Sequence, residues 1–540
     1  MNCIYSEQCL MYVDRMFSMI DRDPFSKTRG CADRNYWSWK FTDFPGARFQ
    51  ESAFSVAWLY SSNFNGNKYF KKNKLLLWYS YIVSYWASIQ NKDGSFDEAY
   101  PNEKSLAGTA FSSFYVAESL ILLKDHLDIE LRKKIISSLE RSGDWLCKNN
   151  ESHGFLSNHQ AVAAASLFSI WKITKKNIYL DRCNYFVNNI LNKQSIEGWY
   201  EEYGGADIGY LSHGLFYLAI IWKETNNVKL LKSLNRATNF FSFFIHPNKT
   251  IGGEYSSRNT NFYYPAAFEI LSEVDKNSRS ICSFMMSSIA NKKSVGIQTI
   301  DLYNFFPILN NYMFSTIYFN KKIKSLKLPF QNSFTKLYKE AGIFIHSSKN
   351  YYLIFGISKG GVIKVYCKKT NKLIYSNSGY VIKSRENHIT SQAFIRDNRF
   401  YLGKNKIQIK VPFVKLNQEL MNPFRFILFR TYNLLFCRNR YLAKFIKNLI
   451  VTKLVTKFKI TNSYLTKEII FSQNKIILID NIYYINLKKN NLFCEDFFTT
   501  IHMGSSKYFQ IDELENKTIS PHEIKYISNS HLKLTYILNI

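Results

Sequence analysis

The sequence predicts an α+β multidomain protein, with an N-terminal (α/α) toroid of helical hairpins followed by an antiparallel β-sandwich domain. A chain of 540 residues is long for a single core, so two domains are the natural expectation. Apolar residues repeat with the helical period over roughly the first 300 residues, and the period changes to that of short strands near residue 335. Within the helical part a glycine beside an aromatic residue recurs in four loops, Gly94-Ser95-Phe96, Gly154-Phe155, Gly198-Trp199 and Gly253-Glu254-Tyr255.

The intervals between these glycines are 60, 44 and 55 residues, the size of one two-helix hairpin with its loops. A helical hairpin cannot bury its apolar face alone, so successive hairpins must stack or close into a ring. We therefore expect the toroid over residues 31–295, preceded by an extension over 1–30. All four loops then emerge at one end of the array, and the polar residues just after them gather around one mouth.

Short segments that are rich in β-branched and aromatic residues predict the second domain, and they include GVIKVYC, KIQIKVPFV and EIIFSQNKIILIDNIYYINL. We expect an antiparallel sandwich over residues 336–540, joined to the toroid by a connector over 296–335. One segment, 421–457, has helical spacing and carries eight Lys and Arg without an Asp or Glu. It is either a helical insertion packed on the sandwich or a basic amphipathic element on an anionic membrane surface.

The net charge of +30 is concentrated in the second part of the chain, where residues 301–540 carry 37 Lys and Arg against 13 Asp and Glu. Such a domain attracts polyanions, which include acidic polysaccharides, anionic lipids and nucleic acids. A compositional bias toward Lys and Asn accounts for part of the charge equally well. Because no DNA- or RNA-binding motif accompanies it, we expect an anionic polysaccharide as partner and no nucleic acid.

The nine cysteines are scattered and never form a C-x-x-C pair, which argues against a disulfide framework and a structural zinc site. Glu7 and Asp14 interrupt the apolar core that a signal peptide needs, and no run of 18 apolar residues exists. These patterns predict a cytoplasmic protein, with peripheral contact at the inner membrane if the basic segment binds lipid.

Polar residues after the loops are the candidate catalytic groups. Asn158 takes the expected N-cap position of one helix and His159 its first turn, although capping and helix packing alone would explain both. In the next loop Asp207 is an expected N-cap, and Tyr210 and His213 lie three residues apart on one helical face.

The remaining candidates come from neighbouring loops and from a cluster of cations and aromatic residues before the first helix. Aromatic faces beside cations suit a charged sugar ring, although the cluster could equally be a hydrophobic lid with its cations reaching solvent. The loop candidates are Glu202, Arg258, Asn259 and Tyr263, and the cluster comprises Arg34, Tyr36, Trp37, Trp39, Lys40 and Arg48.

Asn, His, Tyr and Arg at one mouth suit removal of the proton at C5 of a uronic acid. That proton lies α to a carboxylate and becomes acidic only when the carboxylate charge is neutralised, which Asn or Arg can do. A His or Tyr takes the proton, and a Tyr can return one to the leaving oxygen or to the opposite face of C5. This chemistry requires no metal and no other cofactor.

Asn158-His159 followed about fifty residues later by Tyr210, on helical hairpins with a β domain behind them, resembles the heparinase II/III-like enzymes. These belong to the wider group of α/α-toroid polysaccharide lyases and uronyl epimerases. The resemblance extends over nearly the whole chain and is closest to members from bacterial surface-polysaccharide gene clusters. It includes the segments GADIGYLSHG, KGGVIKVY (359–366) and IHMGSSKYF (501–509).

The resemblance implies C5 chemistry on a uronic-acid-containing polysaccharide, most simply β-elimination by a lyase. A uronyl C5-epimerase of surface-polysaccharide biosynthesis and a non-catalytic glycan-binding protein are the alternatives. Asn158 and Arg258 would neutralise the carboxylate, with His159 as base and Tyr210 as acid/base. His388 and His502 compete to complete the cleft from the β domain. The implied substrate-binding residues are Arg34, Tyr36, Trp37, Trp39, Lys40, Arg48, Glu202, His213, Asn259, Tyr263 and His502.

Overall fold

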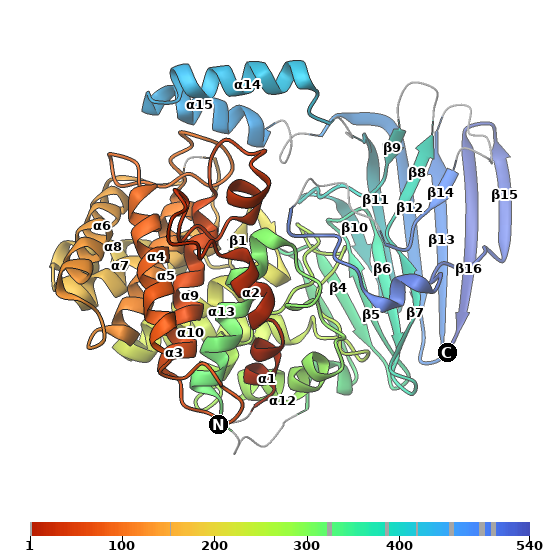
Figure 1. The fold of residues 1–540 in the computed structure, drawn as a ribbon. Coiled ribbons are helices and arrows are strands. Elements are labelled where there is room, and N and C mark those ends of the chain that lie inside the picture. The colour runs from red at the N-terminus through yellow and green to blue at the C-terminus, as the bar shows by residue number, and fades with distance from the viewer. Residues whose placement is uncertain are drawn as a thin grey trace.

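The computed structural model describes residues 3–151, 153–320, 327–383, 388–416, 420–452, 458–484, 492–497 and 504–540. A helical domain and a domain of two β-sheets lie side by side, with a helical hairpin above the helical domain (Figure 1). This arrangement confirms the predicted toroid followed by an antiparallel β domain.

The inner ring of the helical domain is nearly all buried, because each inner helix faces both the ring centre and an outer helix. Successive inner helices contact one another, and the last one contacts the first, so the ring closes. The inner helices are α3 (Ser52–Ser61), α5 (Leu106–Leu123), α7 (Ser157–Thr174), α9 (Ile208–Thr225), α11 (Ala266–Leu271) and α13 (Leu302–Tyr318).

The outer helices are amphipathic and cover the ring. In α6, for example, Ile135, Leu139 and Leu146 face the inner helices, and Asp128 caps the N-terminus by accepting from the backbone of Glu130. The outer helices are α4 (Asn73–Ser88), α6 (Ile129–Lys148), α8 (Asn177–Asn192), α10 (Val228–Ser242) and α12 (Lys276–Ala290).

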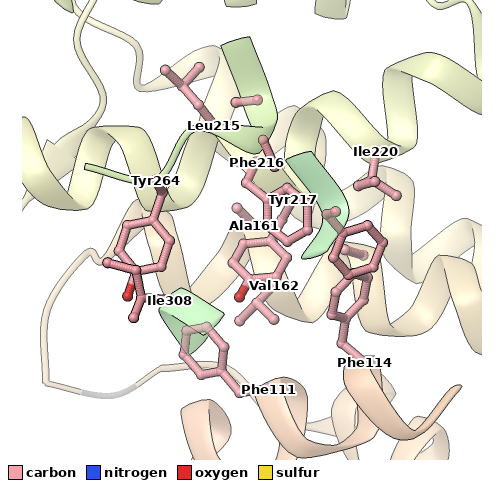
Figure 2. Close-up of a cluster of buried hydrophobic side chains, with 14 of the residues drawn as sticks. Phe111, Phe114, Ala161, Val162, Leu215, Phe216, Tyr217, Ile220, Tyr264 and Ile308 are labelled. Atoms are coloured by element: carbon pink, nitrogen blue, oxygen red, sulfur yellow. The ribbon is translucent and has the colours of Figure 1, made fainter. Parts of the chain in front are cut away.

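The centre of the ring is filled with side chains, so it is a packed core and not a channel. Figure 2 shows Phe111 and Phe114 of α5 beside Phe216 and Tyr217 of α9. The Phe114 and Tyr217 rings meet edge to face with centroids 5.2 Å apart. Polar chemistry is therefore confined to the ends of the ring, where the loops lie.

The helical domain extends beyond the expected range 31–295 at both ends. Helix α1 (Ile4–Met11) packs against α13, and Tyr5 donates a 2.6 Å hydrogen bond to the buried Glu269. Helix α2 (Val13–Met19) follows it, and α13 lies within the range predicted as a connector. The physical reason is closure, since α11 and α3 would expose their facing sides to water without α13 between them.

The five-stranded sheet lies between the helical domain and the other sheet, and its three central strands are almost wholly buried on both faces. Alternate residues follow this arrangement, since Phe344 and Leu353 join the core between the sheets while Ile345 and Tyr352 join the core of the helical domain. Its strands, in sheet order, are β3 (Phe334–Tyr338), β4 (Ile343–Ser347), β5 (Tyr351–Gly356), β6 (Val362–Cys367) and β7 (Lys372–Asn377).

The larger sheet is also antiparallel, with spatial order β14-β8-β9-β11-β12-β13-β16-β15 and β10 paired to β11. Its inner face closes the sandwich, as predicted. Its strands are β8 (Tyr380–Lys383), β9 (His388–Thr390), β10 (Arg399–Leu402), β11 (Lys406–Lys415), β12 (Ile460–Phe471), β13 (Lys475–Tyr483), β14 (Leu492–Cys494), β15 (Glu523–Ser528) and β16 (His531–Asn539). A short hairpin, β1 (Glu201–Glu202) and β2 (Gly205–Ala206), belongs to the helical domain.

The basic segment forms a helical hairpin, α14 (Pro423–Phe436) and α15 (Arg440–Val451), between β11 and β12, and residues 453–457 lie outside the described part of the chain. As a simple insertion, the basic segment was expected to pack on the β-sandwich, and this expectation is wrong. Figure 1 shows the hairpin above the helical domain, where the Phe429 and Tyr100 rings meet at 5.1 Å and Arg430 pairs with Asp43 at 3.0 Å.

Two of the loop glycines allow the chain to pass close to an outer helix. Gly94 and Gly198 have φ of +94° and +108°, and a Cβ at either position would lie 2.2 or 2.4 Å from the carbonyl oxygen of Arg141 or Arg236. The repeated glycine of the sequence is therefore a requirement of backbone packing at these two loops.

We expect Gly198→Ala to lower Tm clearly more than Gly204→Ala. Both replacements put a side chain at positive φ, which costs roughly 1–2 kcal/mol. Gly204 has φ +83° with nothing within 4 Å of its Cβ position, whereas at Gly198 the methyl group meets backbone and adds about 1–3 kcal/mol of overpacking. Thermal unfolding followed by circular dichroism makes the comparison, and equal Tm losses would contradict the packing explanation.

Candidate active site

The loops that lead into α7, α9 and α11 are hydrogen-bonded to one another at one end of the ring. Tyr203 donates its backbone N–H to the Phe155 carbonyl at 3.2 Å, and Ser257 donates to the Ala206 carbonyl at 3.0 Å. Residues from three hairpins therefore share one mouth, as the repeat predicts.

Glu202 is the centre of this mouth. Its carboxylate is fully buried and accepts the Ser157 hydroxyl at 2.7 Å, the Asn158 backbone N–H at 2.8 Å and the Asn158 side-chain amide at 2.8 Å. The Arg258 guanidinium donates to the same carboxylate at 3.2 Å. The two residues predicted to neutralise a substrate carboxylate thus converge on a carboxylate of the protein.

Asn158 is not the N-cap that the sequence predicted. Helix α7 begins one residue earlier, at Ser157, after Leu156, which has no side-chain cap to offer. The amide of Asn158 is instead directed to Glu202, and its Oδ1 is buried without a hydrogen-bond partner among the residues that the structure describes. The Asp207 cap is confirmed, because its carboxylate accepts the Tyr210 N–H at 2.9 Å.

Tyr210 lies against Arg258, whose guanidinium carbon is 4.2 Å from the centre of the tyrosine ring. The Tyr210 hydroxyl donates to the Ser505 hydroxyl at 2.8 Å, so a segment of the β domain covers it. Burial raises the pKa of the Tyr210 phenol, against the opposing charge of Arg258. The hydroxyl is therefore protonated at neutral pH.

His159 is partly accessible, with 21% of its side chain exposed. Its Nδ1 lies 2.8 Å from the Glu151 carboxylate, which also lies 2.9 Å from His153. Burial alone would raise the pKa of Glu151, but Lys447, His153 and His159 together lower it well below its usual value. The carboxylate is thus ionised and can accept a proton carried on Nδ1 of His159, and in that tautomer Nε2 is the ring nitrogen that can take up a proton.

Lys447 comes from helix α15 and connects the hairpin to this pair. Its ammonium lies 3.3 Å from Glu103 and 3.7 Å from Glu151. Although burial opposes it, the charges of these two carboxylates raise the pKa of Lys447 above its usual value. A positive charge is therefore fixed beside the mouth.

His213 lies deeper than Tyr210, and the two ring centroids are 6.5 Å apart. It stacks between Phe111 and Tyr264, and its Nε2 is 3.0 Å from the Tyr217 hydroxyl. Burial and the nearby Arg48 charge lower the pKa of His213 well below its usual value, so it is neutral. It packs behind the predicted catalytic groups.

Other predicted residues are dispersed. Asn259 is buried in the loop of Arg258, with φ +61°, while Tyr263 packs in the core between Phe241 and Phe268. Tyr263 is therefore a core residue, away from the mouth. His388 lies in β9, and His502 lies outside the described residues.

The expected cluster of cations and aromatics does not form one surface. Arg48 is largely buried, pairs with Glu51 at 2.9 Å and lies 4.2 Å from the Phe111 ring centre. Trp39 is 65% exposed, and Trp37 donates its indole N–H to the Met19 carbonyl at 2.7 Å. The rest of the cluster, Arg34, Tyr36 and Lys40, lies with Trp37 and Trp39 in or beside the short helical turn Asn35–Trp39.

Sequence reasoning missed Glu151 and Ser505, and it assigned Lys447 to a membrane or packing role. Glu151 stands only eight residues before His159, so an acid near a candidate base was available as a signal. Ser505 and Lys447 are separated from Tyr210 and His159 by nearly 300 residues, and no local pattern could join them.

Two cavities adjoin Glu151. One of about 120 Å³ is lined by Glu103, Lys444 and Lys447, and one of about 480 Å³ lies on the side of Gly154 and Phe155. The smaller is well below the roughly 300–1,000 Å³ of typical ligand sites. Helix α15 contributes Lys444 and Lys447 to the lining of the smaller cavity. In the described part of the chain no group of three or more His, Cys, Asp or Glu could hold a metal ion.

Residues 45–265 match the family model described as the ulvan lyase N-terminal domain. Among solved structures, the chain is similar to the chondroitin AC lyase of Streptomyces coelicolor A3 in complex with chondroitin sulphate, with 8% identity and a TM-score of 0.57. That match covers 89% of this chain and 66% of the lyase, just under two thirds of its length. At this identity the likeness shows the fold.

A heparan sulfate lyase mutant from Pedobacter heparinus is also similar, with 12% identity and a TM-score of 0.45 over 89% of this chain and 69% of that one. No curated protein matches the sequence. The range of the family match contains Asn158, His159, Tyr210 and Arg258.

Lys359, the first residue of the KGGVIKVY segment, is a buried lysine beside this mouth. Its ammonium donates to the Ser257 carbonyl at 3.1 Å, next to Arg258. Burial lowers the pKa of Lys359 to about 7, against the raising influence of Asp207 and Glu254. The five-stranded sheet thus contacts the Arg258 loop through a group that changes charge near neutral pH.

We expect the stability of the protein to rise with pH above 7 through Lys359. In the unfolded chain a lysine titrates near 10.4, so between about 7 and 10.4 the unfolded state binds more protons and the folded state gains up to about 1.4 kcal/mol per pH unit. Lys359→Met should remove this dependence, whereas Lys349→Met, at an exposed lysine, should keep it. Denaturation at pH 7 and pH 9 measures both, and parallel curves for wild type and Lys359→Met would refute the shift.

Proposed function

We propose that this chain, whose residues 45–265 match the ulvan lyase N-terminal domain, is an enzyme that cleaves a uronic-acid-containing polysaccharide by β-elimination. One observation carries the proposal. His159, held by an ionised Glu151, stands at the same mouth as the Arg258–Tyr210 stack. A base held by a carboxylate and an acid that is protonated at neutral pH are the two groups that this reaction needs.

In the proposed reaction His159 Nε2 takes the C5 proton of the uronic acid. The electron pair of the broken C–H bond passes into an enediolate and then forms the C4–C5 double bond as the C4–O bond breaks. Tyr210 donates its phenolic proton to the leaving oxygen, and a substrate oxygen replaces Ser505 as its acceptor. Solvent then restores both protonation states. The raised pKa of Tyr210 supports its role as acid rather than base.

Neutralisation of the substrate carboxylate falls to Asn158 and Arg258. Both already donate to Glu202, which fixes their direction but also offsets part of the Arg258 charge. The substrate carboxylate would bind beside Glu202, with Lys447 as a further cation at the rim. The Oδ1 of Asn158, which is buried and has no hydrogen-bond partner in the described part of the chain, is suited to a sugar hydroxyl.

Epimerisation at C5 shares the first proton abstraction but not the second step, because the proton returns to the opposite face of C5 and the chain stays intact. A glycan-binding protein would do neither. Incubation with uronic-acid polymers in D₂O separates the three. An unsaturated uronate absorbance supports the lyase, and deuterium at C5 without cleavage identifies an epimerase. A polymer that binds to the protein but gives neither product identifies a binding protein.

We place this activity in a reducing, cytoplasmic compartment. All nine cysteines are free and six of them are buried, which supports the assignment, because secreted proteins commonly pair theirs. Fractionation of the source cells tests it, and recovery from the periplasm or medium would overturn it.

We expect Tyr210→Phe to lower kcat by about a hundredfold or more while polymer binding changes little. The ring and its stacking on Arg258 remain, and only the hydroxyl that would protonate the leaving oxygen is lost. Ser505→Ala is the matched control, because it removes the same hydrogen bond but keeps the Tyr210 hydroxyl. Initial rates and polymer affinity are measured for both variants.

The control separates chemistry from domain contact. If Ser505→Ala loses as much activity as Tyr210→Phe, the contact with the β domain matters and the acid role of Tyr210 is wrong. Wild-type rates for Tyr210→Phe together with an inactive His213→Gln would instead move the acid to the adjacent turn of α9.

A further inference from the structure

We propose that the α14–α15 hairpin docks on an anionic membrane surface through its exposed face. The proposal stands on the surface of the hairpin and is independent of the catalytic assignment. The outward face of the hairpin carries large apolar side chains that are exposed to solvent, whereas the face toward the protein carries charged pairs. The exposed apolar side chains are Leu420, Met421, Phe424, Phe426, Ile427, Leu428, Leu434, Leu435, Phe436, Tyr441, Leu442, Phe445 and Leu449.

The inner face of the hairpin is polar by comparison. Arg430 pairs with Asp43 and Lys447 with Glu103, while the Asn433 carbonyl accepts from Asn102 at 3.4 Å. A helix that docks on a protein in water normally buries its apolar side and exposes its charges. The opposite arrangement indicates that the outer side faces an apolar medium.

The remaining charges match an anionic surface. Arg425, Arg438 and Lys444 are exposed on the hairpin, and residues 420–452 contain no Asp or Glu. Cations beside apolar side chains are what an interfacial helix requires, since the chains enter the acyl boundary and the cations stay with the headgroups. A second copy of this chain would bring the same positive charge to the contact, which disfavours self-association.

The length of the helices excludes a spanning role for the hairpin. Helices α14 and α15 have 14 and 12 residues, which is about 21 and 18 Å at 1.5 Å per residue, short of the roughly 30 Å hydrocarbon core. Among the described helices, α5 alone is long and apolar enough to cross a membrane, and 83% of it is buried in the protein. The hairpin would therefore lie in the plane of the interface.

Docking through this face would direct the mouth of the toroid toward the bilayer. The inner side of the hairpin contacts Tyr100, Asn102 and Glu103 in the loop before α5, and Glu151 in the loop before α7. Figure 1 shows the hairpin lying across that end of the helical domain. A polymer held at the membrane surface would thus meet the protein at its candidate active site.

Vesicle flotation with the full-length protein tests the proposal. We expect it to float with vesicles of phosphatidylcholine and phosphatidylglycerol, about a hundredfold more strongly than with phosphatidylcholine alone, since three exposed cations contribute. High salt should release it. The triple variant Phe424→Gln, Leu435→Gln, Phe445→Gln removes apolar side chains that are 60–70% exposed, so folding should not suffer.

A matched control replaces exposed apolar residues elsewhere on the surface, by Ile129→Gln, Ile196→Gln and Leu514→Gln. It should float like wild type, whereas the hairpin variant should stay in the soluble fraction. Wild type that never floats, or a hairpin variant that floats unchanged, overturns the proposal. Equal flotation with both vesicle types would show that binding does not depend on anionic lipid and would overturn that part of the proposal. A wild-type dimer in light scattering that becomes monomeric in the hairpin variant, without flotation, identifies a second copy as the occupant.

Discussion

The Glu202 carboxylate is wholly buried, and the start of α7 and the loop before α11 are both bound to it. Several kcal/mol would be lost if this charge kept no partners, so Ser157, Asn158 and Arg258 cannot move independently of it. Because Arg258 stacks on Tyr210, the same carboxylate also determines where the first turn of α9 can lie. The geometry of the mouth thus depends on one internal acid.

The second half of the chain completes this mouth at three points. Lys359 contacts the Arg258 loop, Ser505 accepts from Tyr210, and Lys447 pairs with Glu151. Each contact joins residues more than a hundred positions apart, and each brings a polar group to a place that the helical ring alone leaves open. The β domain therefore contacts the candidate site, and helix α15 lines the smaller of the two cavities beside Glu151.

Local patterns were enough to predict the architecture. The spacing of apolar residues in helices and strands predicted which faces are buried, and Gly94 and Gly198 marked loops that need positive φ. The limits of the toroid were not predictable in this way, since α1 and α13 belong to it only because they close the ring. The site residues also divide into those that a local pattern predicts and those that depend on contacts between distant parts of the chain. Asp207 was recognisable as a cap, but the Glu202 contacts that redirect Asn158 arise from pairing between hairpins.

The hairpin is where local pattern and tertiary context differ most. Its helical spacing and its cations were visible in the sequence, yet which side faces water depends on the acids of the mouth. Asp43, Glu103 and Glu151 draw Arg430 and Lys447 inward, and the helices must then turn their apolar residues out. Helix α15 thereby carries both the exposed apolar face and the cation that contacts Glu151. Lys447 and His159 both contact Glu151, so the hairpin and the candidate base are joined through one carboxylate.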